Sequence, residues 1–421
     1  MLDQLPPEIF ARVLEIAIET WGIGFLPPIR LVNSTCNNIV SSTPSLWGII
    51  ALQKHLWKVL EQQVAKAKQS DIRLSCPKKA SFSRDKRFLR IFDSLVALSH
   101  NWVLAELPTD LLTKTTASSV RRLQVLHLRG SGQPSLASRF FDGKLPLLHT
   151  LTLSNLTVDD WIAGLLSPTI THLTFDHYRL DTMVPMHRYL SCLPNLYTIE
   201  FEDSGFPGVL AAGSSVSLPH LHNLQINNVY NAAPLLLTIC SPNIRVLSMK
   251  DCSAAQMSLV FSDWSQPKHL PSQLQTLELS NVLTHSDLPY LISFLSRIPS
   301  LLRLLITYYE PESIYDGERA LSNVLRALAH PNTNGDWLCS ALIHLCLDVP
   351  LQLIDAIPIA RARGNGEKAL PTPVARLRSV QVPLCAGGTP EEASEFRSFF
   401  LNPVEDVRCM CLSCSFNVAV E

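Results

Sequence analysis

One six-residue pattern constrains the fold of this chain more than any other feature of its sequence. The pattern is L-x-x-L-x-L, with aliphatic residues at its first, fourth and sixth positions, as in Leu148, Leu151 and Leu153, and with phenylalanine at the sixth position of two copies. Ten copies occur, and they begin at Leu123, Leu148, Ile170, Leu196, Leu221, Ile244, Leu274, Leu301, Leu342 and Leu377. The first six copies begin 22 to 26 residues apart, and the later intervals range from 27 to 41 residues. Such a period predicts a solenoid in which each copy contributes one supersecondary unit.

Proline marks the same place in most copies and indicates where each strand starts. It lies two residues before the first aliphatic position at Pro146, Pro168, Pro194, Pro219, Pro242 and Pro299. Proline cannot donate to a hydrogen-bond ladder, and the residue before it avoids the helical region. Since the fourth and sixth positions of a short strand point to the same side, we expect each copy to bury both. The segments 158–166, 287–297, 318–329 and 351–361 are expected to be helical returns.

The array over residues 121–421 resembles the leucine-rich repeat family, which implies an α/β fold of parallel strands with helical returns. That family usually places asparagine or cysteine at the ninth position of the pattern. Here the ninth position holds Ser131, Leu156, Tyr178, Ser204, Val229, Cys252, Val282, Tyr309, Pro350 and Cys385. Because only two of these residues fit, we expect most of the polar ladder at that position to be missing and the coil to be irregular.

Residues 1–52 differ in character from the rest of the chain and predict a small all-α module. The segment Leu5-Pro6-Pro7-Glu8-Ile9 opens a stretch whose apolar residues follow helical spacing and are expected to form one stripe, namely Ile9, Phe10, Val13, Leu14 and Ala17. After a break rich in glycine and proline at 21–28, a second amphipathic segment follows, and Pro44-Ser45-Leu46-Trp47 closes the unit. We expect residues 53–120 to form connecting helices and degenerate first repeats.

This order of motifs resembles an F-box, and it is especially similar to the F-box-like proteins of mushroom-forming fungi. The resemblance implies a substrate-recognition subunit of a Skp–cullin–F-box ubiquitin ligase, which would bind a protein target through its repeats. The adaptor-binding residues that it implies are Leu5, Pro6, Ile9 and Phe10, with Leu31, Val32, Leu46 and Trp47 behind or beside them. The family's second helix normally carries a basic stretch with a tryptophan, whereas residues 33–38 are uncharged and Cys36 takes the place of that tryptophan. The alternative is a repeat scaffold whose N-terminal helices only cap the solenoid.

Motifs for catalysis or cofactor binding are missing from the sequence. It has no phosphate-binding glycine loop, no H-E-x-x-H and no G-x-S-x-G. A net charge of −1 gives no electrostatic case for nucleic acid or an anionic membrane as a partner. We therefore expect a non-catalytic chain with no cofactor, whose partners would carry out ubiquitin transfer.

Cysteine usage favours a cytoplasmic or nuclear protein. The eleven cysteines are odd in number, and the first residues lack the basic and apolar regions of a secretory signal, so we expect no disulfide framework. Cys409, Cys411 and Cys414 have metal-like spacing, but a structural zinc site needs four ligands and no second pair is visible. We interpret them as part of a closing strand and expect no metal.

The third, fifth and seventh positions of the pattern should face away from the core and are candidates for target binding. The residues selected on this basis are His172, Asp176, Glu200, Glu202, Gln225 and Asn227. With neighbouring strands about 4.8 Å apart, Asp176, Glu200 and Glu202 are predicted to form a small acidic patch that suits a basic segment. The alternative is an ordinary solvated strand face.

Overall fold

The structure is a computed structural model that contains two compact units, Met1–Arg179 and Leu180–Glu421. It describes residues 5–21, 23–52, 57–67, 70–76, 86–112, 120–130, 140–141, 145–156, 160–178, 184–206, 215–252, 256–307, 314–348, 353–364, 374–382, 389–400 and 407–409. Among these residues, no helix is both long enough and apolar enough to cross a membrane.

The first unit begins with helices and continues as parallel strands. Its helical part consists of α1 (Pro7–Trp21), η2 (Ile23–Phe25), α2 (Leu26–Arg30), α3 (Ser34–Ser42) and α4 (Pro44–Gly48). The elements that follow are β1 (Ile49–Ala51), α5 (Trp57–Lys66), β2 (Ile72–Ser75), α6 (Lys86–Ala97), η4 (Ser99–Asn101), β3 (Trp102–Pro108), α7 (Thr109–Leu112), β4 (Val125–Arg129), β5 (Thr150–Ser154), η5 (Asp160–Gly164) and β6 (His172–Asp176). Strands β1 to β6 pair in parallel in chain order.

The N-terminal helices pack into a small module whose local signals are readable in the sequence. Phe10 and Leu14 bury one face of α1, which packs against α3 and α4. Helix α3 begins where the Asn33 side chain accepts a hydrogen bond from the Cys36 backbone N–H at 2.7 Å. The indole N–H of Trp47 donates to the carbonyl of Val40 at 2.8 Å, which ties α4 to the end of α3.

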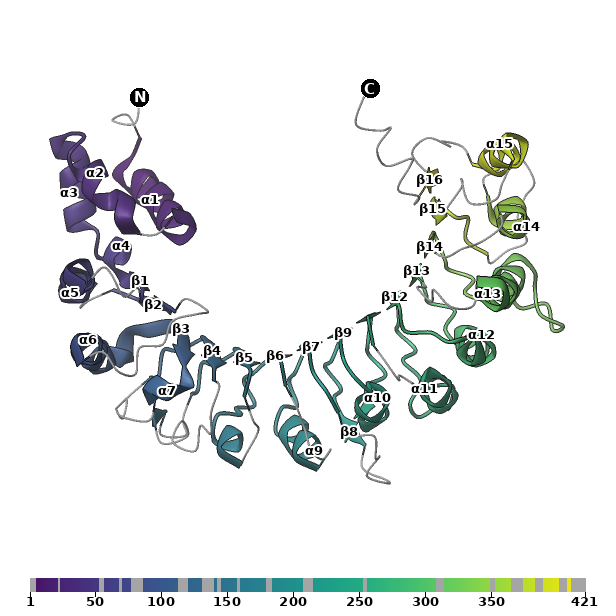
Figure 1. Cartoon of the computed structure of the whole chain (residues 1–421), viewed down its shortest axis with the longest axis horizontal. Coiled ribbons are helices and arrows are strands. Elements are labelled where there is room, and N and C mark those ends of the chain that lie inside the picture. The colour runs from purple at the N-terminus through teal and green to yellow at the C-terminus, as the bar shows by residue number, and fades with distance from the viewer. Residues whose placement is uncertain are drawn as a thin grey trace. The chain divides into compact units, whose positions relative to one another are not determined.

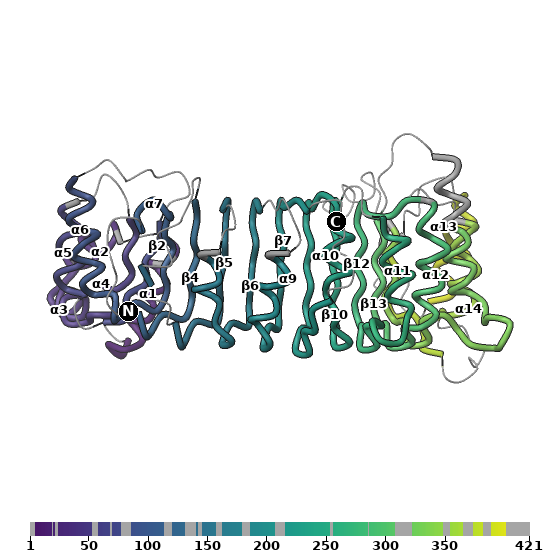
Figure 2. The backbone as a smooth tube through the Cα atoms, turned by 90° about the horizontal axis from the view of Figure 1, so that it is seen from below, coloured from purple at the N-terminus to yellow at the C-terminus, as the bar shows by residue number. Residues whose placement is uncertain are grey.

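The second unit repeats one strand and one return many times. Its elements are α9 (Val184–Ser191), β7 (Thr198–Glu202), β8 (Val216–Ser217), β9 (Asn223–Asn227), α10 (Ala233–Thr238), β10 (Ile239–Cys240), β11 (Val246–Lys250), α11 (Met257–Trp264), β12 (Thr276–Ser280), η6 (His285–Asp287), α12 (Leu288–Leu295), β13 (Arg303–Thr307), α13 (Ile314–Ala329), β14 (His344–Asp348), α14 (Leu353–Arg363), β15 (Ser379–Val382), α15 (Pro390–Ser398) and β16 (Val407–Cys409). Figure 2 shows these turns of the backbone side by side within the unit.

All ten copies of the sequence pattern form strands, and these strands pair in parallel in both units. Leu277 on β12, for example, lies opposite Leu247 on β11 and Leu304 on β13. The fourth and sixth positions of the described copies are buried, so the core lies between the strands and the returns. In the second unit, α11 to α15 follow one another along one side of the strands (Figure 1). The predicted α/β leucine-rich repeat solenoid is therefore confirmed.

Three further strands precede the first copy, and the pattern search does not find them. Ile50, Leu74 and Ala105 occupy the fourth position of β1, β2 and β3, as the strand register shows. Trp102, which is fully buried, replaces the leading leucine of β3, and a register shift interrupts the pairing of β2 with β3. These substitutions keep the apolar burial of a repeat while they break its leucine signature.

The eighth position of the pattern, directly after the strand, holds residues with a left-handed backbone. Those with positive φ are Asn155, His177, Asp203, Asn228, Asp251 and Asn281, with φ between 48° and 52°. Asparagine and aspartate tolerate this conformation better than most residues because their short polar side chains bond locally. The backbone N–H of Asn281 donates to the carbonyl of Thr307 at 2.9 Å, and that of Asn228 donates to Lys250 at 2.8 Å.

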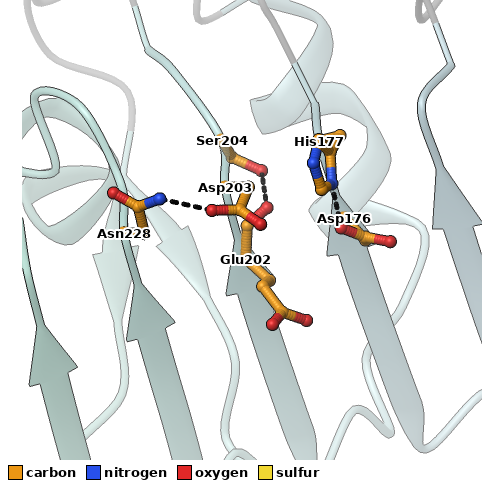
Figure 3. A network of polar contacts seen from close by, with 6 residues as sticks. All are labelled: Asp176, His177, Glu202, Asp203, Ser204 and Asn228. Carbon is orange, nitrogen blue, oxygen red and sulfur yellow. Dashed lines mark hydrogen bonds and ion pairs between the residues drawn. The ribbon is translucent and has the colours of Figure 1, made fainter.

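Side chains at the eighth position also form a polar row. The Asn281 amide donates to the Asp251 carboxylate at 2.6 Å, and the Asn228 amide donates to Asp203. Figure 3 shows the second pair, together with the bond from Ser204 to the Glu202 carbonyl. The ninth position holds buried residues such as Leu156 and Val229 instead. A polar ladder is thus present one residue before the ninth position, and within each unit the strands of the ten copies pair without a register shift.

Candidate interaction sites

Helix α1 carries a second apolar stripe that the module does not bury. Ile9, Val13 and Ile16, spaced four and three residues apart, share one side of the helix, and we call them the α1 stripe. Their exposed fractions are 52%, 47% and 52%, whereas Phe10 and Leu14 on the neighbouring side are at most 4% exposed. The helix therefore has one apolar side in the core of the module and another at its surface.

The turn between α2 and α3 adds two more exposed apolar side chains. Leu31 is 87% exposed and Val32 is 64% exposed, which is unusual for residues of this size. Seven of the thirteen large apolar residues found exposed in the described part of the chain lie between Leu5 and Val32. Exposed apolar surface of this density is typical of a protein-interaction site.

The residues that the F-box resemblance implies divide into two groups. Leu5, Pro6, Ile9, Leu31 and Val32 are exposed. The other three, Phe10, Leu46 and Trp47, are buried, so they support the surface from behind. Val13 and Ile16 complete the exposed side of α1. Helical spacing places Val13 in one stripe with Phe10 and Leu14, but in the structure those two side chains are buried and Val13 is exposed.

The residues selected for target binding lie on three strands in two units. His172 and Asp176 are the first and last residues of β6 in the first unit. In the second unit, Glu200 on β7 lies opposite Gln225 on β9, and Glu202 lies opposite Asn227. The structure brings together these two pairs, while the acidic patch that would join Asp176 to Glu200 and Glu202 stays a prediction.

A polar hollow lies over the ends of the strands in the first unit, and we call it the strand hollow. Its volume is about 680 Å³, and it opens to solvent. Its lining includes Cys76 from the end of β2, Glu106 from β3, His127 and Arg129 from β4, Thr152 and Ser154 from β5, and Asp176 and His177 from the end of β6. Asp176 is thus the one residue of the predicted target-binding set that lines this hollow.

Each carboxylate of the strand hollow has a histidine beside it. Nδ1 of His177 lies 2.5 Å from Oδ1 of Asp176 (Figure 3), and Nδ1 of His127 lies 3.8 Å from Oε1 of Glu106. Burial lowers the pKa of His127, Glu106 opposes that shift, and Arg129 adds to it. His127 therefore favours its neutral form, and the hollow combines two acids, two imidazoles and one guanidinium.

Cys76 lines the same hollow but is no nucleophile at neutral pH. Burial, the largest cause, raises the pKa of its thiol to about 12. Neither Cys76 nor Glu106 could be placed in a site from the pattern alone, because β2 and β3 lack the leucine signature. The signal for Glu106 in the sequence is the spacing of Trp102, Ala105 and Leu107, which reproduces the pattern with a different leading residue. Cys76 has no such signal, because the leading position of β2 holds Asp71.

The cysteine cluster with metal-like spacing lies mostly outside the described residues. Cys409 ends β16, which pairs in parallel with β15. Cys411 and Cys414 fall beyond the described part of the chain. The interpretation of this segment as a closing strand therefore has structural support at Cys409 alone.

Comparisons with known proteins find similar solved structures but no matching sequence. No protein-family model and no curated protein matches the sequence. A crystal structure of a TLR13–ssRNA13 complex is similar with 14% identity and a TM-score of 0.41, and the match covers 68% of this chain and 36% of that one. An internalin (InlF) from Listeria monocytogenes strain 4b F2365 is similar with 13% identity and a TM-score of 0.33, over 68% of this chain and 82% of that one. The chain thus spans about a third of the TLR13 chain.

Proposed function

We propose that this chain is the substrate-recognition subunit of a Skp–cullin–F-box ubiquitin ligase. Its N-terminal module docks a Skp-type adaptor, and its repeats hold a protein target. The chain itself does no chemistry and needs no cofactor, because it acts by keeping the target close to a ubiquitin-charged enzyme. The observation that carries the proposal is the α1 stripe together with Leu31 and Val32, all of which are exposed.

The exposed stripe favours docking over simple capping. The terminal cap of a repeat array has a polar outer face, because that face meets water. Here the outer side of α1 is apolar, although its inner side already has Phe10, Leu14 and Ile18 in the core. A helix that only capped the array would gain nothing from Ile9, Val13 and Ile16.

The surroundings of the stripe are typical of a protein interface, with an apolar centre and a polar rim. Arg12 lies beside the stripe on α1, and its Nη1 pairs with Oε2 of Glu15 at 2.7 Å. The sequence that leads into the helix, from Leu5 to Ile9, is the part that resembles an F-box. These features support a protein partner on this side of the module, and the F-box resemblance favours a Skp-type adaptor as that partner.

The competing hypothesis is a repeat scaffold whose N-terminal helices only cap the array. It has one observation in its favour: α4 leads directly into β1, the first strand of the first unit. Trp47, at the end of α4, is buried against this junction, where the Lys66 ammonium lies 3.9 Å from the centre of its ring. Capping and docking use opposite sides of the module, so variants on the outer side separate them.

The test is co-purification of the full chain with a Skp-type adaptor and a cullin. Two double variants, Leu5→Asp with Pro6→Ala and Ile9→Asp with Val13→Asp, should each abolish adaptor capture. Leu259→Asp on α11 and Ile354→Asp on α14 are matched controls, since these side chains are 49% and 56% exposed. Circular dichroism should show that all variants fold. Unchanged capture in both double variants, or no capture by the unmodified chain, would refute docking and favour the scaffold.

The proposed function also implies where in the cell the protein acts. A Skp-type adaptor and a cullin scaffold operate in the cytoplasm or nucleus, so we propose that location for this chain. Neither nucleic acid nor a membrane is required as a partner.

A further inference from the structure

Arg129 stands apart from the other charged residues of the strand hollow. Asp176 and Glu106 each have a histidine beside them. Among the described residues, Arg129 has neither an ion pair nor a hydrogen bond from its guanidinium, and its side chain is half-buried. Its charge nevertheless acts on the hollow, because it lowers the pKa of both His127 and Cys76. A half-buried cation without a partner is costly unless something else satisfies it.

The position of Arg129 places further hydrogen-bond donors next to it. It is the last residue of β4 and lies opposite Ser154, the last residue of β5. Thr152 lies opposite His127 in the same pair of strands. Neighbouring strands are about 4.8 Å apart, so a group bound at Arg129 can also reach the Ser154 or Thr152 hydroxyl. Within the described part of the chain, neither hydroxyl has another hydrogen-bond partner.

We propose that the strand hollow binds an oxyanion on the target, either a carboxylate or a phosphate, through Arg129 with Ser154 and Thr152. A guanidinium presents paired N–H donors that match two oxygens of such a group. The inference rests on the proposed function, in that the repeats bind a protein target, but it does not require adaptor docking. It names the chemistry of the target segment, which the fold alone leaves open.

The pairing of the two acids argues against a basic segment at this hollow. A target lysine would have to compete with His177 for Asp176, where the two side chains are 2.5 Å apart. At Glu106 it would meet His127 and Arg129 on the next strand. An oxyanion at Arg129 displaces no side-chain contact among the described residues, and its negative charge pairs with the guanidinium.

The test is binding of the full chain to arrayed peptides of random sequence with one fixed position. The fixed residue is Asp, Glu, phosphoserine, Lys or Ala. We expect the Asp, Glu or phosphoserine sets to be enriched over Ala and Lys, and the contrast between carboxylate and phosphoserine sets identifies the source of the oxyanion. Arg129→Gln should weaken binding to the best set by about tenfold or more, since a charged hydrogen bond contributes about 1.5 to 3 kcal/mol. Arg90→Gln on α6, an exposed arginine, is the matched control and should leave binding unchanged.

Two further measurements make the result decisive. Arg129→Lys keeps the charge but removes the paired donors, so it should retain part of the binding that Arg129→Gln loses. Adaptor capture by both variants should equal that of the unmodified chain, which separates failure of this inference from failure of adaptor docking. Enrichment of the Lys set, no enrichment of any acidic or phosphorylated set, or equal binding by Arg129→Gln would overturn the proposal.

Discussion

The left-handed residue at the eighth position of the repeat is predicted to be a conformational requirement as well as a hydrogen-bonding one. Asn281 tests this because both roles are visible there. Its φ is 51°, its backbone N–H donates to Thr307, and its side-chain amide donates to Asp251 at 2.6 Å. Replacement by alanine removes the amide and leaves a side chain that disfavours this backbone, whereas replacement by glycine removes the amide alone.

The expected magnitudes follow from these two terms. A left-handed backbone costs an ordinary residue about 1 to 2 kcal/mol, and loss of a side-chain hydrogen bond costs about 0.5 to 1.5 kcal/mol. Asn281→Ala should therefore lower the free energy of unfolding by about 2 to 3 kcal/mol. Asn281→Gly avoids the backbone term and adds about 0.4 to 1 kcal/mol of chain entropy in the unfolded state, so its loss should be about 1 to 2 kcal/mol.

The assay is urea unfolding of the full chain followed by circular dichroism, with the two variants beside the unmodified protein. The decisive quantity is the urea concentration at the midpoint of unfolding, which should be lower for Asn281→Ala than for Asn281→Gly. A glycine variant that is less stable than the alanine variant would refute the idea that backbone conformation selects these residues. An alanine variant as stable as the unmodified chain would refute the role of the polar row altogether.

Three other properties of the chain can be predicted in the same way. A Cβ atom at Gly48 would lie 2.2 Å from the backbone oxygen of Asp71, whereas one at Gly24 would meet nothing within 4 Å. Gly48→Ala should therefore lower the melting temperature, and Gly24→Ala should leave it unchanged. Burial lowers the pKa of His127 below its ordinary value of 6.5. Between the two pKa values the unfolded chain therefore binds more protons than the folded one, and stability falls as the pH drops through this range. Melting curves from pH 5 to 8 should show a weaker acid loss for His127→Gln, and an identical pH profile would contradict this reasoning. Cys192 is exposed, while burial raises the pKa of Cys76 and Cys339 to about 12. Maleimide labelling read by mass spectrometry should therefore modify Cys192 in the folded protein and the other two only after unfolding, and early labelling of Cys76 would contradict its burial.

The strands of the array could be predicted from the sequence because burial of two alternate side chains leaves a regular signature. Each of the ten copies forms a strand, and the return expected over 318–329 lies inside α13. The strands β1 to β3 could not be found in this way, since their leading positions hold Trp47, Asp71 and Trp102 in place of an aliphatic residue. What identifies them is pairing with β4, which is a property of the fold.

The polar ladder could not be located from the sequence for a different reason. A search at the ninth position finds buried apolar residues, because in this chain the left-handed turn falls one residue earlier. The alternation of asparagine and aspartate at Asp203, Asn228, Asp251 and Asn281 is visible in the sequence, but its meaning depends on the backbone conformation.

The candidate sites could also be predicted from the sequence only in part. Helical spacing predicts an amphipathic α1, yet it treats Ile9, Phe10, Val13 and Leu14 as one stripe. Packing against α3 and α4 decides that Phe10 and Leu14 are buried while Ile9 and Val13 are exposed. The strand hollow depends on β2 and β3, so its content of Cys76 and Glu106 could not be predicted from the repeat alone.

Hydrogen–deuterium exchange of the full chain, with and without a purified Skp-type adaptor, tests the proposed function most directly. The adaptor should slow exchange in α1 and in residues 26–33, where the exposed apolar side chains lie. Exchange in the repeats from β4 onward should stay unchanged. No protection at α1 under conditions in which the adaptor binds an established F-box protein, or protection confined to the repeats, would contradict adaptor docking.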